Sequence, residues 1–357
     1  MTLKERLVAE IRATGPMTVA HYMTACLHDP LGGYYATRPA LGEDGDFITA
    51  PMISQMFGEL IGLWVVETWR GMGAPARVLL VEAGPGTGVL MQDALRAARL
   101  DPAFIAAADL WLIETSAPLA ALQRERLADA PLSPEWAMSL GALPADLPVI
   151  LIANELLDCL PARQLVRTET GWAERMVGLN DAGDLIFGLA PRDVPGPNLD
   201  VAPGAVVEIS EQQTAFADTL AARLARYGGA ALLIDYGRGQ PGVGDTFQAL
   251  QRHQKVDPLS HPGDADLTVH ADFPAVIAAA RAAGARAGLL TQGDFLRRLG
   301  IEQRAAALAR ARPDQAQVIA RQLARLIDPD QMGDLFKAAC LYAGDGPPPP
   351  GFEDLHA

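Results

Sequence analysis

Four short apolar runs, separated by stretches of helical pattern, constrain the fold of this chain more than any other feature. They span residues 77–82, 110–114, 148–153 and 230–235. Each is five or six residues long and rich in Val, Ile or Leu, which is typical of strands buried on both faces. Strands that alternate with helices form parallel sheets. We therefore expect an α/β fold of the Rossmann-like type with a mostly parallel central sheet.

The remaining segments predict additions to this sheet. Helical spacing predicts helices at 3–14, 18–27 and 53–70, with Thr18 as an N-cap. Residues 162–190 alternate polar and apolar side chains around turn residues, which predicts an antiparallel β insertion. Residues 286–290 and 335–342 are late strand candidates that flank the Ala/Arg-rich helical segment 302–327. The expected regions are an N-terminal helical lid (1–70), the core (71–161 and 205–343), the β insertion (162–204) and a Pro-rich coil tail (344–357).

The charge balance bears on the partners. Among 357 residues the formal net charge is −14. An acidic surface repels phosphate backbones, and we identify no local basic patch, so we expect no nucleic-acid partner. The acidity suits a cationic partner, although a solvated acidic surface has the same composition.

The cysteines and the N-terminus also restrict the function. Cys26, Cys159 and Cys340 match no metal or redox spacing, and we expect them to be buried apolar residues without a metal. The N-terminus lacks the apolar core of a signal peptide, and no window of about twenty residues is continuously apolar. We expect a cytoplasmic bacterial protein without a membrane span.

A glycine-rich turn, Glu82-Ala-Gly84-Pro-Gly86-Thr-Gly88, follows the first apolar run. Glycines at this point let the chain turn tightly and let a ligand approach the backbone. A phosphate loop needs Gly-Lys-Ser/Thr, but Val89 and Leu90 follow here. A dinucleotide fingerprint needs a glycine where Val89 stands, which weakens that interpretation.

Two carboxylates favour S-adenosylmethionine as the ligand. Glu82 would repel a pyrophosphate but attracts the amino group of an amino-acid moiety. Glu114, at the tip of the second run, is placed to accept hydrogen bonds from ribose hydroxyls. We also place Thr115, its neighbour, in the cofactor site. The alternative is that the glycines only tighten strand-to-helix packing.

Eight motifs in order, this turn among them, together resemble the MidA family of methyltransferases over residues 15–343. The motifs are Gly45-Asp-Phe-Ile-Thr49-Ala-Pro51, Phe57-Gly-Glu59, the glycine-rich turn, Glu114-Thr-Ser116, Asn154-Glu-Leu-Leu-Asp158, Ile234-Asp-Tyr-Gly237, Asp266-Leu-Thr-Val-His-Ala-Asp-Phe273 and Thr291-Gln-Gly-Asp-Phe-Leu296. The resemblance implies a class I methyltransferase with a seven-stranded sheet that uses S-adenosyl-L-methionine. The eukaryotic members resemble mitochondrial assembly factors that dimethylate an arginine of a respiratory complex I core subunit. By analogy, a complex I subunit is the expected protein partner.

One departure from the family pattern concerns the loop before the helix at 53–70. The family commonly has Pro-Glu-Ile-Ser, whereas this chain has Met52 at the second position. A carboxylate near the expected site is therefore missing. In the same loop, Asp46 and Thr49 are candidates to close over the cofactor, although Gly-Asp is also a common turn pair.

Candidate catalytic residues follow the third apolar run. A site that methylates arginine needs carboxylates to hold the guanidinium in a bidentate fork. We expect Asn154 to contact the cofactor, and Glu155 and Asp158 to face the acceptor from one side of a helical turn. The alternative is that Asn154 or Asp158 caps a following helix.

Three other functions remain open from the sequence. One is a methyltransferase for a small molecule or another protein side chain. Another is a cofactor-binding assembly chaperone with little turnover, and the last is a nicotinamide oxidoreductase, which Val89 disfavours.

Overall fold

The computed structural model describes residues 1–37 and 49–354, so Asp46 lies outside the described residues. Contacts divide the chain into two compact units. We call them the insertion unit, residues 1–47, 157–213 and 240–272, and the sheet unit, residues 48–156, 214–239 and 273–357. The expected domain boundaries differ, because residues 48–70 group with the sheet and residues 240–272 group with the insertion. None of the described helices is long and apolar enough to cross a membrane.

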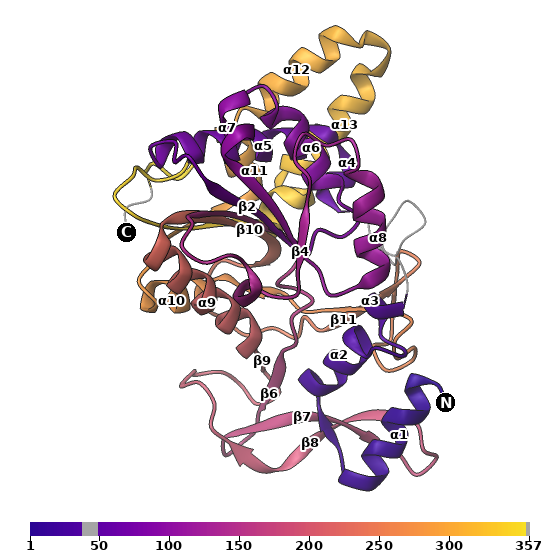
Figure 1. Cartoon of the computed structure of the whole chain (residues 1–357). Coiled ribbons are helices and arrows are strands. Elements are labelled where there is room, and N and C mark those ends of the chain that lie inside the picture. Colours follow the sequence, from indigo (N-terminus) through magenta and orange to yellow (C-terminus); the bar gives the residue numbers. More distant parts are fainter. Residues whose placement is uncertain (38–48, 355–357) are drawn as a thin grey trace. The chain divides into compact units, whose positions relative to one another are not determined.

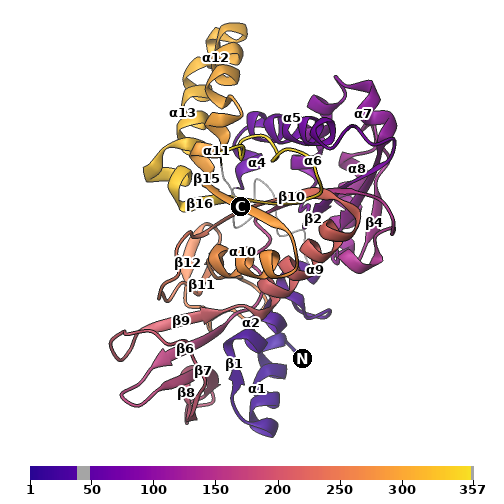
Figure 2. The ribbon, with the colours of Figure 1, turned by 90° about the vertical axis from the view of Figure 1, so that its left-hand side faces the viewer.

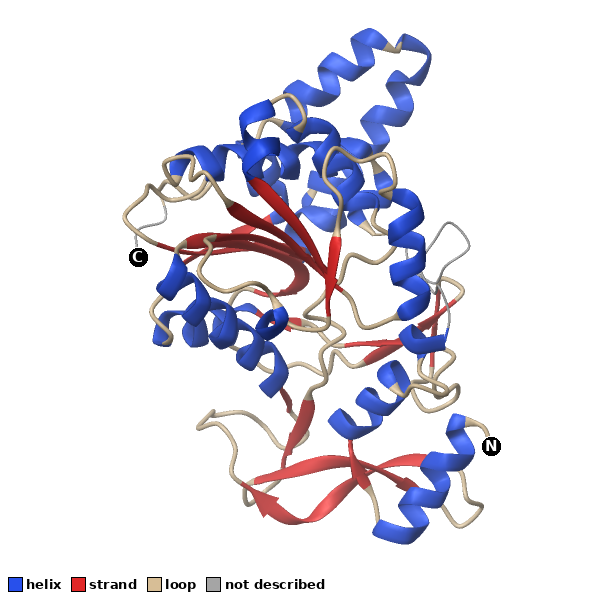
Figure 3. Ribbon diagram, viewed as in Figure 1, coloured by secondary structure: helices blue, strands red, loops and turns tan. Residues whose placement is uncertain are grey.

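A seven-strand path forms the centre of the sheet unit (Figures 1 and 3). Its spatial order is β15-β16-β10-β5-β2-β3-β4. The strands are β2 (Val78–Ala83), β3 (Ala108–Ile113), β4 (Glu135–Ala137), β5 (Val149–Asn154), β10 (Gly229–Arg238), β15 (Arg286–Thr291) and β16 (Phe336–Ala343). Strands β10, β5, β2, β3 and β4 pair in parallel, and β16 runs antiparallel to both its neighbours. The expected mostly parallel sheet is therefore confirmed.

Burial explains why three of the four apolar runs became inner strands, whereas the run at 110–114 became β3, which alternates buried and half-buried residues. Every residue of β2 and of β5 is buried, and β10 is buried along all but its last residue. Strands covered on both faces need continuous apolar sequence, because any polar side chain loses water on either side.

Helices cover both faces of this sheet (Figures 1 and 2). Helices α5, α6 and α11 lie on one face, and α9 and α10 lie on the other. The helices of the sheet unit are α4 (Ala50–Ile53), α5 (Gln55–Gly71), α6 (Val89–Ala98), α7 (Pro102–Ala107), α8 (Ala117–Arg126), α9 (Glu211–Tyr227), α10 (Phe273–Ala282), α11 (Gln292–Arg298), α12 (Ile301–Ala311) and α13 (Ala316–Ile327).

Three expected segments differ in detail. The helix expected at 53–70 is broken at Ser54, whose extended backbone ends α4 and whose hydroxyl accepts a hydrogen bond from the Met56 amide to begin α5. Segment 302–327 is two helices, because Pro313 interrupts the helical hydrogen bonds. The tail has no regular element up to residue 354, as expected, yet Phe352 is fully buried against Phe295.

The insertion unit contains the antiparallel sheet that alternation predicted. Its strands follow the order β1-β7-β6-β9, and β8 pairs with β7. The elements of this unit are α1 (Leu3–Thr14), β1 (Met17–Thr18), α2 (Val19–His28), α3 (Tyr34–Thr37), β6 (Arg163–Arg167), β7 (Trp172–Leu179), β8 (Leu185–Val194), β9 (Val206–Ile209), β11 (Gln248–Gln251), β12 (Gln254–Val256), β13 (Asp266–Thr268) and β14 (Ala271–Asp272). The Thr18 hydroxyl accepts from the His21 amide, so the predicted N-cap is confirmed.

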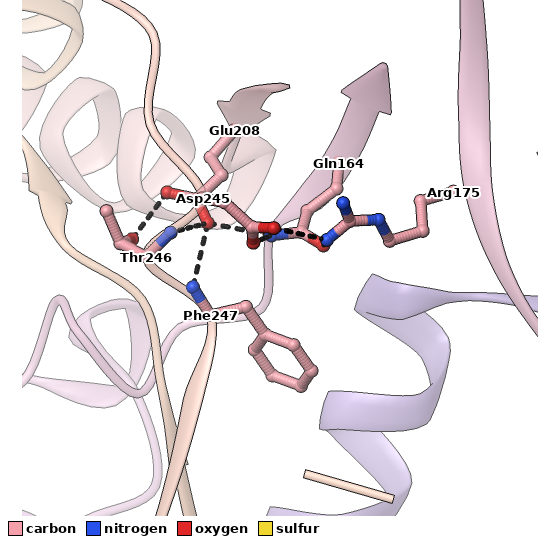
Figure 4. Close-up of polar contacts among 6 residues, drawn as sticks. All are labelled: Gln164, Arg175, Glu208, Asp245, Thr246 and Phe247. Carbon is pink, nitrogen blue, oxygen red and sulfur yellow. Dashed lines mark hydrogen bonds and ion pairs between the residues drawn. The ribbon is translucent and has the colours of Figure 1, made fainter. Parts of the chain in front are cut away.

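Hydrogen bonds to a buried carboxylate link residues 245–247 to this antiparallel sheet (Figure 4). Glu208 is 4% exposed and accepts hydrogen bonds from the amides of Thr246 (2.9 Å) and Phe247 (3.0 Å) and from the Gln164 side chain (2.9 Å). Arg175 and Asp245 form an ion pair of 2.8 Å beside it, at the wall of an open pocket of about 450 Å³. The polar groups lining this pocket pair with one another, which is the arrangement of a structural polar network.

Candidate cofactor site

The carboxyl ends of β2, β3 and β5 meet at one edge of the sheet. Glu82 pairs in register with Leu112 on one side and with Ile152 on the other. Ligands of open α/β sheets bind outside the carboxyl ends of the strands. Glu82, Glu114 and Asn154 therefore come from three adjacent strands to the edge where a ligand is expected.

The glycine-rich turn leaves β2 through three left-handed residues. Gly84, Gly86 and Gly88 have φ values of 67°, 53° and 81°. A Cβ atom at Gly84 would lie 3.0 Å from Cδ1 of Leu156, so space is also limited there. Gly88 is the N-cap of α6, and no side chain caps that helix. The turn therefore exposes backbone amides at a helix N-terminus, and the glycines are required by conformation.

The carboxyl group of Glu82 is buried away from water. The residue is 2% exposed, and its Oε2 atom has no hydrogen-bond partner among the residues that the structure describes. Burial raises the pKa of Glu82 to about 8, and the neighbouring Glu114 carboxylate adds to the rise. A buried carboxylate with an unused acceptor is costly unless a donor or a cation reaches it.

Glu114 is held in place by its surroundings. One oxygen accepts from the Ser116 amide at 2.7 Å and the other from Gln123 Nε2 at 2.9 Å. Burial raises the pKa of Glu114, and these hydrogen bonds counteract the rise. Each carboxylate oxygen has a second lone pair, so the residue retains capacity to accept hydroxyl donors. The side chain of its neighbour Thr115 is exposed.

Gln123 is a site residue that the sequence analysis missed. It is fully buried, and its Nε2 atom donates both to Glu114 and to the Gly86 carbonyl at 2.8 Å. Its Oε1 atom accepts from the Trp136 indole at 2.8 Å. Gln123 therefore joins the glycine turn to the acid of the next strand. No sequence motif marks it, because its partners come together only in the fold.

Glu155 follows β5 in a strained conformation. Its φ is +52°, which costs a residue with a side chain about 1–3 kcal/mol and is seen mainly where surrounding contacts enforce it. Its Oε1 atom accepts from Asn154 Nδ2 at 3.0 Å and from the Ala50 amide at 3.2 Å. Asn154 is 9% exposed, and its Oδ1 atom has no hydrogen-bond partner within the described part of the chain. Asn154 and Glu155 thus meet the start of α4.

The helical turn that we predicted after β5 does not form, so this prediction is wrong. Residues 155–160 form bends and turns, so Glu155 and Asp158 do not share a helix face, and neither Asn154 nor Asp158 caps a helix. The left-handed Glu155 turns the chain away from the helical path. Asp158 is buried in the insertion unit, near Tyr35, whose pKa it helps to raise.

The loop residues before α5 have simpler positions. Thr49 is the N-cap of α4, but its side chain makes no capping hydrogen bond. Met52, where the family commonly has Glu, is half-buried within α4. The three cysteines are buried, as predicted, and none forms a disulfide within the described part of the chain. No group of acidic, His and Cys side chains suited to a metal occurs in the part of the chain that the structure describes.

Comparisons with known proteins agree with this geometry. A family model for S-adenosyl-L-methionine-dependent methyltransferases matches residues 60–290. The mitochondrial protein arginine methyltransferase NDUFAF7 of Xenopus tropicalis is 33% identical, covering 94% of this chain and 84% of the relative. Its Drosophila melanogaster homologue is 35% identical, with 96% and 85% covered.

A solved structure has the same fold and contains the cofactor product. It is a COG1565 superfamily member from Burkholderia thailandensis bound to S-adenosyl-homocysteine. Its sequence is 27% identical, its TM-score is 0.86, and the match covers 99% of this chain and 94% of that one. The glycine cradle, the two acids at the strand ends and the unused acceptors on Glu82 and Asn154 fit such a cofactor. The chain belongs to the MidA family of S-adenosyl-L-methionine-dependent methyltransferases.

Proposed function

We propose that this enzyme methylates an arginine side chain of a protein, and that the acceptor is a subunit of the respiratory NADH dehydrogenase. The observation that carries the arginine assignment is the similarity, over more than nine-tenths of the chain, to relatives named protein arginine methyltransferases. The identity of the subunit rests on the family resemblance. Glu155, whose backbone is strained, carries the carboxylate that would bind the guanidinium group of this acceptor.

The cofactor would be held by the sheet edge. The Glu82 carboxylate would bind its ammonium group, and Glu114 would accept its ribose hydroxyls. The amides of the glycine turn and Oδ1 of Asn154 would complete the contacts. When bound, S-adenosyl-L-methionine supplies an electrophilic methyl group on a sulfonium ion. Thr49 and Thr115 remain predicted members of this site, as does Asp46.

Glu155 would orient the acceptor. An arginine side chain carries its positive charge at neutral pH, since its pKa lies above 12. A carboxylate binds guanidinium through directed N–H···O hydrogen bonds and fixes which nitrogen faces the reaction centre. The same carboxylate favours loss of a proton from that nitrogen as methylation proceeds. Asn154 Nδ2 and the Ala50 amide hold one oxygen of Glu155 in place for this role.

The Glu155→Gln variant tests the assignment. We expect S-adenosyl-homocysteine to bind with an affinity within about threefold of wild type. Methyl transfer to the NADH dehydrogenase subunits should fall by about a hundredfold or more, the size typical for loss of a positioned acid–base group. Calorimetry measures the first quantity, and mass spectrometry of the subunits with isotopically labelled methyl donor measures the second.

A deletion strain supplies the control. Its NADH dehydrogenase should lack methylation at one arginine, and the wild-type enzyme should restore it. An unchanged arginine methylation pattern in the deletion strain would exclude this acceptor. Full methylation by the Glu155→Gln enzyme would instead exclude Glu155 as the orienting group.

A further inference from the structure

Helices α12 and α13 form a hairpin that extends beyond the sheet of its own unit (Figures 1 and 2). Residues 301–327 contain five arginines and only two acidic residues, in a chain whose net charge is −14. This is the Ala/Arg-rich segment of the sequence analysis, and its local charge balance is positive although we expected no basic patch. The arginines are spread over 22 positions, and the structure places them on two adjacent helices and the turn between these helices.

Four of these arginines are available for binding. Arg310, Arg312, Arg321 and Arg325 are exposed, and their side chains form no hydrogen bond or ion pair with any residue that the structure describes. The fifth, Arg304, donates to Glu59 of α5 at 2.8 Å. Exposed arginines elsewhere in the sheet unit are often paired, as Arg70 is with Asp101 and Arg77 with Asp109. We call the four unpaired residues the arginine tip. Arg310 and Arg312 lie near the turn between the two helices, and Arg321 and Arg325 lie four residues apart along α13.

The hairpin is a fixed support for these side chains. On α13, Ile319, Leu326 and Ile327 are buried in the main core. The carbonyls of the last two accept hydrogen bonds from Gln292 and Arg297 of α11, each at 2.9 Å. A base that is fixed in this way reduces the entropy lost when the guanidinium groups engage a partner.

We propose that the arginine tip binds an acidic surface of a partner protein. Guanidinium groups match carboxylates in charge and in their forked hydrogen-bond geometry. The remainder of this chain is strongly acidic and repels such a partner, so attraction is confined to the hairpin and orients the encounter. The inference goes beyond the proposed methylation and does not depend on which residue is methylated.

A membrane surface fits the hairpin less well. Helices that bind bilayers insert an apolar face beside their basic residues. The apolar face of α13 is already buried, and Val318, at 41% exposure, is the one large hydrophobic residue of the two helices among the exposed ones described. The hairpin therefore lacks the apolar area needed for insertion.

A nucleic acid is also disfavoured. Residues 301–327 contain no aromatic side chain on which a base could stack. Four guanidinium groups are also fewer than the six to ten phosphate contacts typical of strong backbone binding.

Binding of a fluorescent polyglutamate peptide to the full-length protein tests the proposal. The test variant replaces the four arginines of the tip with Gln. The control variant carries Gln at Lys4, Arg12, Arg99 and Arg192, four exposed cationic residues outside the hairpin. Both variants lose four positive charges. Comparing their affinities therefore distinguishes binding at the hairpin from an effect of net charge, and thermal melting shows whether each variant is folded.

We expect anisotropy titrations at 50 mM NaCl to show about tenfold weaker binding by the tip variant, the size expected when several exposed ion pairs are lost. The control should stay within twofold of wild type, and raising the salt to 200 mM should remove the difference. Equal losses in both variants, or no peptide binding by the wild type, would overturn the proposal. Tighter, tip-dependent binding to phosphatidylglycerol vesicles or to duplex DNA would overturn it in favour of those partners.

Discussion

Glu82 shows how a single residue can couple cofactor binding to pH. Its carboxyl is buried, and its pKa of about 8 means that it is protonated at neutral pH in the unliganded protein. The protonated form binds an ammonium group poorly, whereas the carboxylate binds it well. Binding of the cofactor should therefore release a proton from this residue.

We predict that affinity for S-adenosyl-homocysteine rises between pH 6 and pH 8, because the carboxylate fraction of Glu82 rises over this interval. Calorimetry in buffers of different ionisation enthalpy measures both the affinity and the proton released. The Glu82→Gln variant should bind more weakly above pH 8 and lose this pH dependence, whereas the exposed Glu125→Gln should behave as wild type. A pH-independent affinity in the wild type would contradict the proposed role.

The same group has a defined effect on stability without cofactor. Its folded-state pKa lies above the value of about 4.3 that an unfolded Glu has. The folded state therefore binds more protons than the unfolded state between about pH 4.5 and pH 8. The free energy of unfolding falls as the pH rises through this interval, and the loss is complete once the pH has passed 8. We expect cofactor binding to offset this loss, because the ammonium group proposed to bind Glu82 favours the charged form of its carboxyl.

At the scale of elements, the α5–α6 crossing depends on two glycines. A Cβ atom at Gly62 would lie 2.2 Å from the Ala94 carbonyl oxygen, and one at Gly58 would lie 2.5 Å from Asp93 Cβ. Such distances require the two helix backbones to move apart. Glu59, between these glycines, accepts from Arg96 and Arg304 and so links α5 with α6 and α12.

We predict that Gly62→Ala lowers the free energy of unfolding by about 1–3 kcal/mol, the usual cost of overpacking. The control is Gly71→Ala at the end of the same helix, where the nearest atom to a new Cβ is a Pro347 side-chain carbon at 3.7 Å. There the gain in helix propensity should leave stability equal or raise it by up to about 1 kcal/mol. Urea unfolding measures both, and similar effects at the two positions would argue against close packing at the crossing.

At the scale of the whole molecule, the described residues that we propose for the cofactor site, from Thr49 to Glu155, all lie within the sheet unit. A ligand that binds the folded state at one hundred times its Kd stabilises that state by about 2.7 kcal/mol. Four tryptophans, Trp64, Trp69, Trp111 and Trp136, belong to the sheet unit, and Trp172 belongs to the insertion unit. Tryptophan fluorescence therefore reports mainly on the unit that contains the site.

We predict that S-adenosyl-homocysteine raises the fluorescence-detected melting temperature by several degrees. The shift should persist in Trp172→Phe, because the remaining tryptophans all lie in the sheet unit. NAD at the same concentration should give no shift. A shift with NAD alone would contradict the assignment of the glycine turn to adenosylmethionine.

The sequence by itself determined the central sheet and the cofactor class. The four apolar runs became β2, β3, β5 and β10. Strands β2, β5 and nearly all of β10 are buried on both faces and therefore need continuous apolar sequence, whereas β3 alternates buried and half-buried residues. The glycines that follow β2 have left-handed backbones, so their conformation is set by residue type. Local sequence rules are sufficient at these positions because each depends on one element and its own turn.

Only the tertiary structure decided how the site is assembled. Gln123 contacts Gly86, Glu114 and Trp136 across three segments, and no spacing in the chain encodes those contacts. The left-handed Glu155 replaces the expected helical turn because contacts with Ala50 and Ile234, more than seventy residues away on each side, hold it there. The grouping of Asp158 with the insertion unit likewise depends on long-range packing, which the sequence pattern of a single segment does not contain.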